Sequence, residues 1–118
     1  MVLFDRNGRP KAFCDDGTHI FLFSGEPVAY FYGDAVYTFK GKQLGWFEAG
    51  WVRDMQGKCV FYWEKDTGYG PVKMTRGVVP TKGVKRTIPV KCTRAIRPTR
   101  AINKLDWSPL SGIEFFQQ

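Results

Sequence analysis

The clearest chemical pattern in this chain is a set of basic side chains at every third position in its second half. Of the ten positions at this spacing between 73 and 100, eight hold lysine or arginine. They are Lys73, Arg76, Lys82, Lys85, Lys91, Arg94, Arg97 and Arg100. Regularly spaced cations are typical of surfaces that bind phosphates. We therefore expect these residues to bind a polyanion such as nucleic acid, or an acidic protein. A solubilising arm is the alternative.

A second candidate site consists of aromatic residues that recur every 16 or 17 positions in the first half of the chain. They are Phe13, Tyr30, Trp46 and Tyr62. Exposed rings at such a spacing could stack on sugars or bases, which would make the protein a glycan-binding module. Aromatic residues that recur once per structural unit can equally form a core, so both interpretations stay open.

The sequence offers little for catalysis or metal binding. His19 is the only histidine, and the neighbouring Asp15 and Asp16 could orient its ring. The one nearby nucleophile, Cys14, has no clear partner, so we predict a structural or surface role for His19. The three cysteines are Cys14, Cys59 and Cys92. Their spacing matches no metal site. We therefore expect no enzyme activity, metal or cofactor.

Charge divides the chain into two parts. Residues 1–68 carry eight Lys/Arg against nine Asp/Glu, whereas residues 69–118 carry ten against two, so the halves have net charges of −1 and +8. This asymmetry indicates a neutral folded body with a cationic arm. There is no apolar run long enough to cross a membrane and no signal-peptide pattern at the start. With an odd number of cysteines, these features favour a bacterial-type cytoplasmic protein with reduced thiols.

The basic residues belong to a segment with a period of three. The column that precedes them in each triplet contains only β-branched residues. Its members are Val72, Thr75, Val78, Thr81, Val84, Thr87, Val90, Thr93, Ile96, Thr99 and Ile102. A period of three is that of polyproline II. We expect the β-branched edge to pack along the body and the basic column to face solvent. A free arm that becomes ordered only on binding is the alternative.

The body contains an internal repeat. Gly8, Gly25, Gly41 and Gly57 are 17, 16 and 16 residues apart, and the flanking residues repeat with them. Each unit reads as strand, tight turn and strand. The predicted two-residue turns are Asn7-Gly8, Ser24-Gly25, Lys40-Gly41 and Gln56-Gly57. The sequence therefore predicts an all-β fold of four sequential β-hairpins, because one hairpin alone is barely stable in water.

Two columns of the repeat predict the interior. An aliphatic residue stands five positions before each glycine, and a small residue stands four positions after it in three of the four units. The aliphatic column is Leu3, Ile20, Val36 and Val52; the small column is Ala12, Ala29 and Gly45, with Phe61 as the exception. We expect each aliphatic residue to pair with its partner across the hairpin, near a central axis.

The last residues form a separate motif. Trp107, Leu110, Ile113 and Phe116 have the spacing of one helical face, with Phe115 beside them. Ser111 and Glu114 have the spacing of a capping box. We predict a short helix that either folds back onto the hairpins or docks on another protein.

The segments FSGEPVAYFYGDAVYTFKGKQLGWFEAGWVRDMQGKCVFYW and WSPLSGIEFF, with the basic tail between them, resemble the four-fold beta flower family of uncharacterised bacterial proteins. The resemblance implies a compact all-β fold with pseudo-fourfold symmetry and implies no activity. We divide the chain into a four-hairpin repeat domain (1–68), a basic extended tail (69–103) and a C-terminal Trp/Phe motif (104–118). A non-enzymatic binding or scaffold module is the function we expect.

Overall fold

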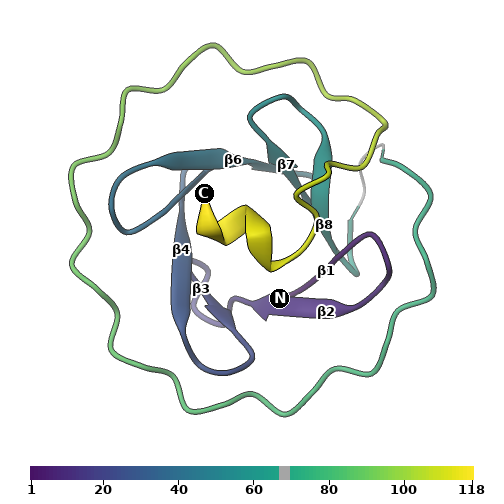
Figure 1. Cartoon of the computed structure of the whole chain (residues 1–118), viewed down its shortest axis with the longest axis horizontal. Helices are drawn as coiled ribbons and strands as arrows, with labels where there is room; N and C mark the ends of the chain where they lie inside the picture. Colours follow the sequence, from purple (N-terminus) through teal and green to yellow (C-terminus); the bar gives the residue numbers. More distant parts are fainter. Residues whose placement is uncertain (67–69) are drawn as a thin grey trace.

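A computed structural model describes residues 1–66 and 70–118. In this part of the chain, eight strands form one closed antiparallel barrel in sequential order (Figure 1). The strands are β1 (Val2–Phe4), β2 (Pro10–Phe13), β3 (His19–Leu22), β4 (Pro27–Tyr32), β5 (Ala35–Tyr37), β6 (Gln43–Glu48), β7 (Trp51–Asp54) and β8 (Cys59–Trp63). The prediction of four sequential hairpins is confirmed. The proposed boundary between residues 68 and 69 lies outside the described residues.

The turns at the four repeat glycines are one residue longer than predicted. In the first hairpin, the Gly8 amide donates to the Asp5 carbonyl at 3.0 Å, and the Asp5 amide donates to the Arg9 carbonyl at 2.9 Å. The same pair of bonds closes the other three turns. Each loop therefore has three residues and ends on a glycine with positive φ, which is a tight turn followed by a β-bulge.

The bulge explains why the predicted register is nevertheless correct. It adds one residue to the loop, and the strands beyond it keep the pairing that the repeat indicated. The four predicted pairs are Leu3–Ala12, Ile20–Ala29, Val36–Gly45 and Val52–Phe61. The side chains of these pairs are buried in the central core, and Gly45, which has no side chain, is buried with them. The small column allows four hairpins to approach one axis, and Phe61 fills more of that space in the fourth.

One end of the barrel is covered by the C-terminus. A short 3-10 helix, η1 (Ile113–Gln117), lies over the centre of the ring in Figure 1 and is called the plug here. Phe115 is fully buried, and the ring of Phe116 stacks on that of Phe61 at 5.4 Å. The C-terminal segment therefore folds back onto the hairpins.

The predicted capping box is wrong. The helix begins after Gly112 without a side-chain cap. The Ser111 hydroxyl instead donates to the carbonyl of Val60 at 2.8 Å and accepts from the amide of Arg6. It therefore joins the plug to two barrel hairpins rather than closing the first turn of the helix.

The basic segment encircles the barrel as an extended belt, defined here as residues 71–104 (Figure 1). Four belt amides donate to the carbonyls of the four hairpin glycines at 2.8–3.0 Å. The pairs are Gly77 with Gly8, Arg86 with Gly25, Ala95 with Gly41 and Lys104 with Gly57. These donors are nine residues apart, so nine belt residues, or three of the sequence triplets, correspond to each hairpin.

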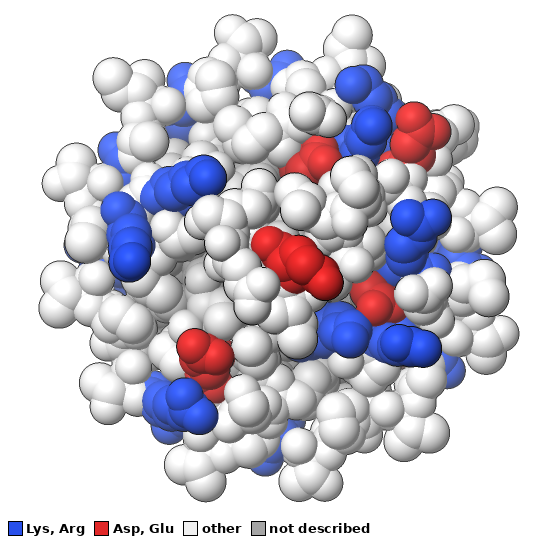
Figure 2. Space-filling model, viewed as in Figure 1, with Lys and Arg blue, Asp and Glu red and all other residues white. Residues whose placement is uncertain are grey.

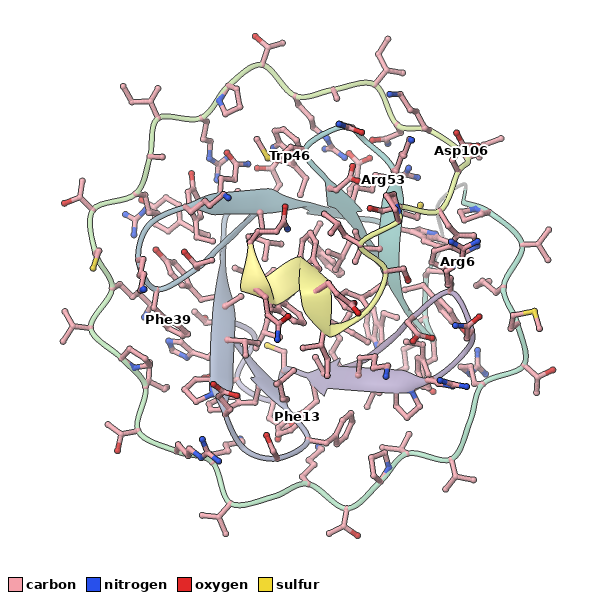
Figure 3. The ribbon with its side chains drawn as sticks, viewed as in Figure 1. Arg6, Phe13, Phe39, Trp46, Arg53 and Asp106 are labelled. Carbon is pink, nitrogen blue, oxygen red and sulfur yellow. The ribbon has the colours of Figure 1, made fainter. Side chains whose placement is uncertain are left out.

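The predicted orientation of the belt is wrong. The aliphatic members of the β-branched column point away from the barrel and are 84–96% exposed (Figure 3). The basic column instead faces the barrel. A β-branched column is typical of a packed face, but β-branched side chains also favour an extended backbone. That preference supports a belt even where nothing covers the side chains.

Candidate functional site

The outer wall of the barrel presents a pair of facing side chains at each of the four seams between hairpins. The cross-strand pairs are Phe4–Tyr62, Phe13–Phe21, Tyr30–Tyr37 and Trp46–Arg53. The ring centroids of the three aromatic pairs are 5.5–6.0 Å apart. These rings alternate along the strands with the residues of the central core, as the pleat of a sheet requires.

The four residues predicted as a stacking platform all belong to these pairs. The exposed fractions of Phe13, Tyr30, Trp46 and Tyr62 are 0, 1, 3 and 0%. A ring must expose a face to stack on a sugar or base. Of the two interpretations that the sequence left open, burial therefore supports the structural one and contradicts the stacking platform, because the belt and the neighbouring side chains cover these rings.

All eight residues of the predicted basic site lie against the barrel. Each places its charged group over at least one aromatic ring, at 3.6–6.0 Å from the ring centroid. The shortest contact is that of Arg94 over Tyr32, and Lys82 lies 4.8 Å from the centre of Phe13. A cation over a ring face is held by about 0.5–1 kcal/mol at an exposed site. The eight cations therefore help to hold the belt against the barrel.

Carboxylates in the segments that follow the hairpins pair with several of the same cations. Lys82 and Lys85 lie 2.9 and 3.1 Å from the carboxylate of Asp15, and Lys73 lies 2.6 Å from that of Asp66. The hydrogen bond from Lys82, aided by Lys85, lowers the pKa of Asp15 below its usual range. The barrel therefore supplies both ring faces and negative charge to the cations of the belt.

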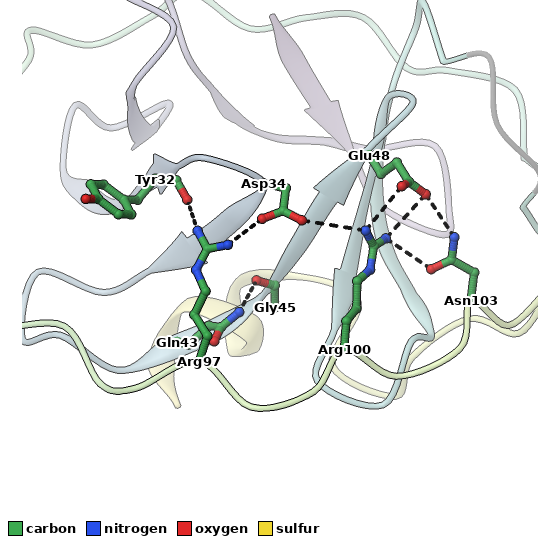
Figure 4. A network of polar contacts seen from close by, with 8 residues as sticks. All are labelled: Tyr32, Asp34, Gln43, Gly45, Glu48, Arg97, Arg100 and Asn103. Carbon is green, nitrogen blue, oxygen red and sulfur yellow. Dashed lines mark hydrogen bonds and ion pairs between the residues drawn. The ribbon is translucent and has the colours of Figure 1, made fainter.

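The last belt contacts form the most connected network (Figure 4). Asp34 lies between Arg97 and Arg100, at 2.6 and 3.8 Å. Arg100 also pairs with Glu48 at 3.2 Å. The amide of Asn103 donates to Glu48 at 3.0 Å. Chiefly through Asn103 and then Arg100, this network lowers the pKa of Glu48.

The fourth seam differs from the other three because its barrel residue is a buried arginine. Arg53 stands in the repeat column occupied by Phe4, Phe21 and Tyr37. One of its guanidinium nitrogens donates to the carbonyls of Gly57 at 2.9 Å and Lys104 at 2.6 Å. The side chain thereby ties the fourth hairpin turn directly to the end of the belt.

His19 lies between the barrel and the belt. Its Nδ1 is 2.7 Å from Asp16, and its Nε2 is 2.8 Å from the ammonium group of Lys91. Because Lys91 occupies the nitrogen that a substrate would need, this arrangement does not resemble a general-base site. Among the described residues, no group of three or more His, Cys, Asp or Glu side chains could hold a metal ion.

The residues of the C-terminal motif are divided between two places. Phe115 and Phe116 fill the end of the barrel, and Leu110 packs on the same core. Trp107 instead packs against Trp51 at 5.7 Å, and its indole N–H donates to the carbonyl of Val72 at the start of the belt. Ile113 is 39% exposed. The predicted single helical face is therefore wrong.

The belt sequence also has a period of nine residues, which is less apparent than its period of three. Four prolines, at positions 71, 80, 89 and 98, are nine residues apart. They divide the belt into four units that match the four hairpins. The same spacing relates Lys73, Lys82, Lys91 and Arg100, which occupy equivalent places at the four seams.

A group of cations beside the plug was missed by the sequence analysis. Arg9 and Lys11 line a hollow of about 220 Å³ on one side, with Glu114 of the plug in its wall. Lys40 and Lys42 line another of about 380 Å³ with Phe116. In the described ranges, none of these four cations forms an ion pair. Figure 2 shows lysine and arginine around most of this face, with acidic residues at fewer places.

Four hairpins, four belt units and one plug define a small all-β barrel with pseudo-fourfold symmetry. Residues 1–116 match the family described as 4-fold beta flower protein, and the chain belongs to that family. Neither the curated proteins nor the solved structures gave a match. In the described part of the chain, no helix is both long enough and apolar enough to span a membrane.

Proposed function

We propose that this protein is a non-enzymatic binding module that engages an acidic partner or polyanion through the face around the plug. This proposal keeps the expected class of function and moves the contact surface. The eight cations first assigned to the partner are occupied by rings and carboxylates of the barrel. An external anion would have to displace those contacts before it could bind there.

The observation that carries the proposal is the set of cations beside the plug. Arg9, Lys11, Lys40 and Lys42 sit on two hairpins with no ion-pair partner in the described residues. Their backbone belongs to two hairpins of the closed barrel, which places all four cations beside the plug. Cations gathered around an open face attract polyanions at low salt and lose them as salt rises.

The glycan-binding alternative loses its support because its four aromatic residues are buried. We keep the cytoplasm of a bacterium as the proposed setting. Cys14 and Cys59 are buried free thiols, and Cys92 is an exposed one, which suits a reducing compartment.

The test is fluorescence anisotropy with a labelled single-stranded oligonucleotide across a salt series. Four contacts would give a log–log slope of about −3. We expect Lys40→Gln with Lys42→Gln to weaken binding and to make the slope shallower. The matched control removes two exposed belt cations, Arg86→Gln with Lys104→Gln, and should have less effect. Failure of the oligonucleotide and of an acidic polypeptide to bind at low salt would contradict the proposal.

A further inference from the structure

Each of the four belt units contacts the barrel through a cation at the equivalent position, and one of these contacts differs in its chemistry. Lys73, Lys82 and Arg100 each pair with a carboxylate, at 2.6, 2.9 and 3.2 Å. Lys91, at the same place in the third unit, lies 2.8 Å from the Nε2 of His19. The other three units thus serve as internal references for this one.

The hydrogen bonds of His19 define its protonation state in this arrangement. Asp16 lies 2.7 Å from Nδ1. Burial alone would raise the pKa of Asp16, but hydrogen bonds from the ring and amide of His19 and from the Thr18 amide hold it well below its usual range. The carboxylate is therefore charged and accepts from Nδ1–H. An ammonium group has only donors, so Nε2 must accept from Lys91 and the imidazole must be neutral.

We propose that His19 is a pH-sensitive latch that holds the third belt unit on the barrel when neutral and releases it when protonated. A protonated imidazole carries hydrogen on both nitrogens. Nε2–H would then face the ammonium group of Lys91 at a distance of 2.8 Å, with two positive charges and no acceptor between them. Lys91 would have to withdraw, whereas the carboxylate contacts of the other units would persist.

The groups that face His19 support this direction of the switch. Asp16 lies three residues from His19 on the barrel itself, so undocking of the belt leaves it beside the ring and it does not distinguish between the two states. Tyr30 pairs with His19 across the hairpin, and the ring of Phe39 lies parallel to the imidazole at 6.4 Å. Burial is the main cause that raises the pKa of the Cys14 thiol, which stays neutral in this range. Lys91 is thus the charged neighbour that changes place, and the released belt binds one more proton than the docked belt.

The sign and the size of the effect follow from that proton count. Imidazole changes charge between about pH 5 and 8. Protonation of the ring therefore weakens docking of the third unit as the pH falls through this range. With one proton taken up on release, the ratio of docked to released belt falls by at most about tenfold per pH unit.

Hydrogen exchange on the full chain tests the proposal. The amides of Cys92 and Ala95 donate to the carbonyls of Phe39 and Gly41 in the third unit. Those of Gly83 and Arg86 donate to Phe23 and Gly25 at the equivalent places in the second. Between pH 8 and pH 5, we expect the protection factors of the first pair to fall several-fold more than those of the second. Equal protection in the two units at every pH would overturn the proposal.

Two variants separate the latch from general loosening. His19→Gln keeps an amide oxygen for Lys91 and cannot gain a proton, so the third unit should stay protected down to pH 5. Lys91→Met should lower protection at pH 8 and remove the dependence on pH. The barrel amide of Phe31, which donates to Thr18, reports whether each variant is folded. A folded His19→Gln protein that still releases the third unit at pH 5 would contradict the proposal.

Discussion

At the scale of single residues, the hairpin glycines have two tasks, of which the sequence repeat predicts only one. Gly41 has a φ of +96°, which closes its turn. An added Cβ there would also lie 2.1 Å from the carbonyl oxygen of Thr93 in the belt. The repeat predicted the first task from the turn alone. The second arises from a segment about fifty residues later, which local sequence does not reveal.

These two tasks can be separated by matched substitutions. Gly17 has a φ of +79° with nothing near an added Cβ, so Gly17→Ala should cost only the left-handed strain, about 1–2 kcal/mol. Gly41→Ala should destabilise the protein more and reduce protection of the Ala95 amide, because the belt must move away. Denaturant unfolding and hydrogen exchange measure both. Equal losses of stability in the two variants would show that belt contact does not matter at Gly41.

At the scale of elements, the barrel was predictable and the belt only in part. The glycine columns gave the hairpins and the core register because both follow from local turn geometry and the two-residue alternation of strands. The period of three in residues 72–102 indicated an extended conformation. Its orientation depended on where the barrel's rings and carboxylates lie. Their positions are set only when the strands pair, so the sequence alone predicts a basic column that faces solvent.

The odd fourth seam provides a test of how belt and barrel match. Phe4 and Phe21 receive Arg76 and Lys85 over their rings, whereas Arg53 has Asn103 at the corresponding belt position. Arg53→Tyr alone removes the bonds to Gly57 and Lys104, and Asn103→Arg alone places a cation near Arg53. We expect both single variants to be destabilised.

The double variant should recover part of that loss, with a coupling energy of about 1 kcal/mol, because it restores a cation over a ring. A double-mutant cycle from denaturant unfolding measures this term. Strictly additive effects would mean that the fourth seam does not follow the design of the other three.

At the scale of the whole molecule, residues 69–118, which include the belt, carry a net charge of +8, and residues 1–68 carry −1. Attraction between opposite charges helps to hold the two parts together. Asp15 and Glu48 have lowered pKa values, caused chiefly by Lys82 and by Asn103 with Arg100. A carboxylate with a lowered folded-state pKa stabilises the fold above its unfolded pKa and loses that contribution as the pH falls through the folded value. We therefore expect stability to drop on acidification below about pH 4.

Unfolding curves between pH 7 and pH 2 check this expectation. Asp15→Asn should show a smaller drop than the parent protein, because one of the titrating contacts is already absent. The drop should be distinct from the loosening proposed for the third belt unit, which occurs at higher pH and leaves the barrel folded. A variant curve parallel to that of the parent would show that Asp15 contributes nothing to the acid response.

The hairpins and the belt units both repeat along the chain, so something must specify which belt unit packs on which hairpin. Four hairpins and four belt units that were truly alike would allow the belt to start one seam early or late with nearly the same contacts. The exceptions break this degeneracy: Arg53 donates to the carbonyl of Lys104 at the end of the belt, and His19 contacts Lys91, whereas the three equivalent cations pair with carboxylates. These irregular residues therefore specify how the belt aligns with the barrel. Symmetry supplies the contacts, and departures from it select one of four possible alignments.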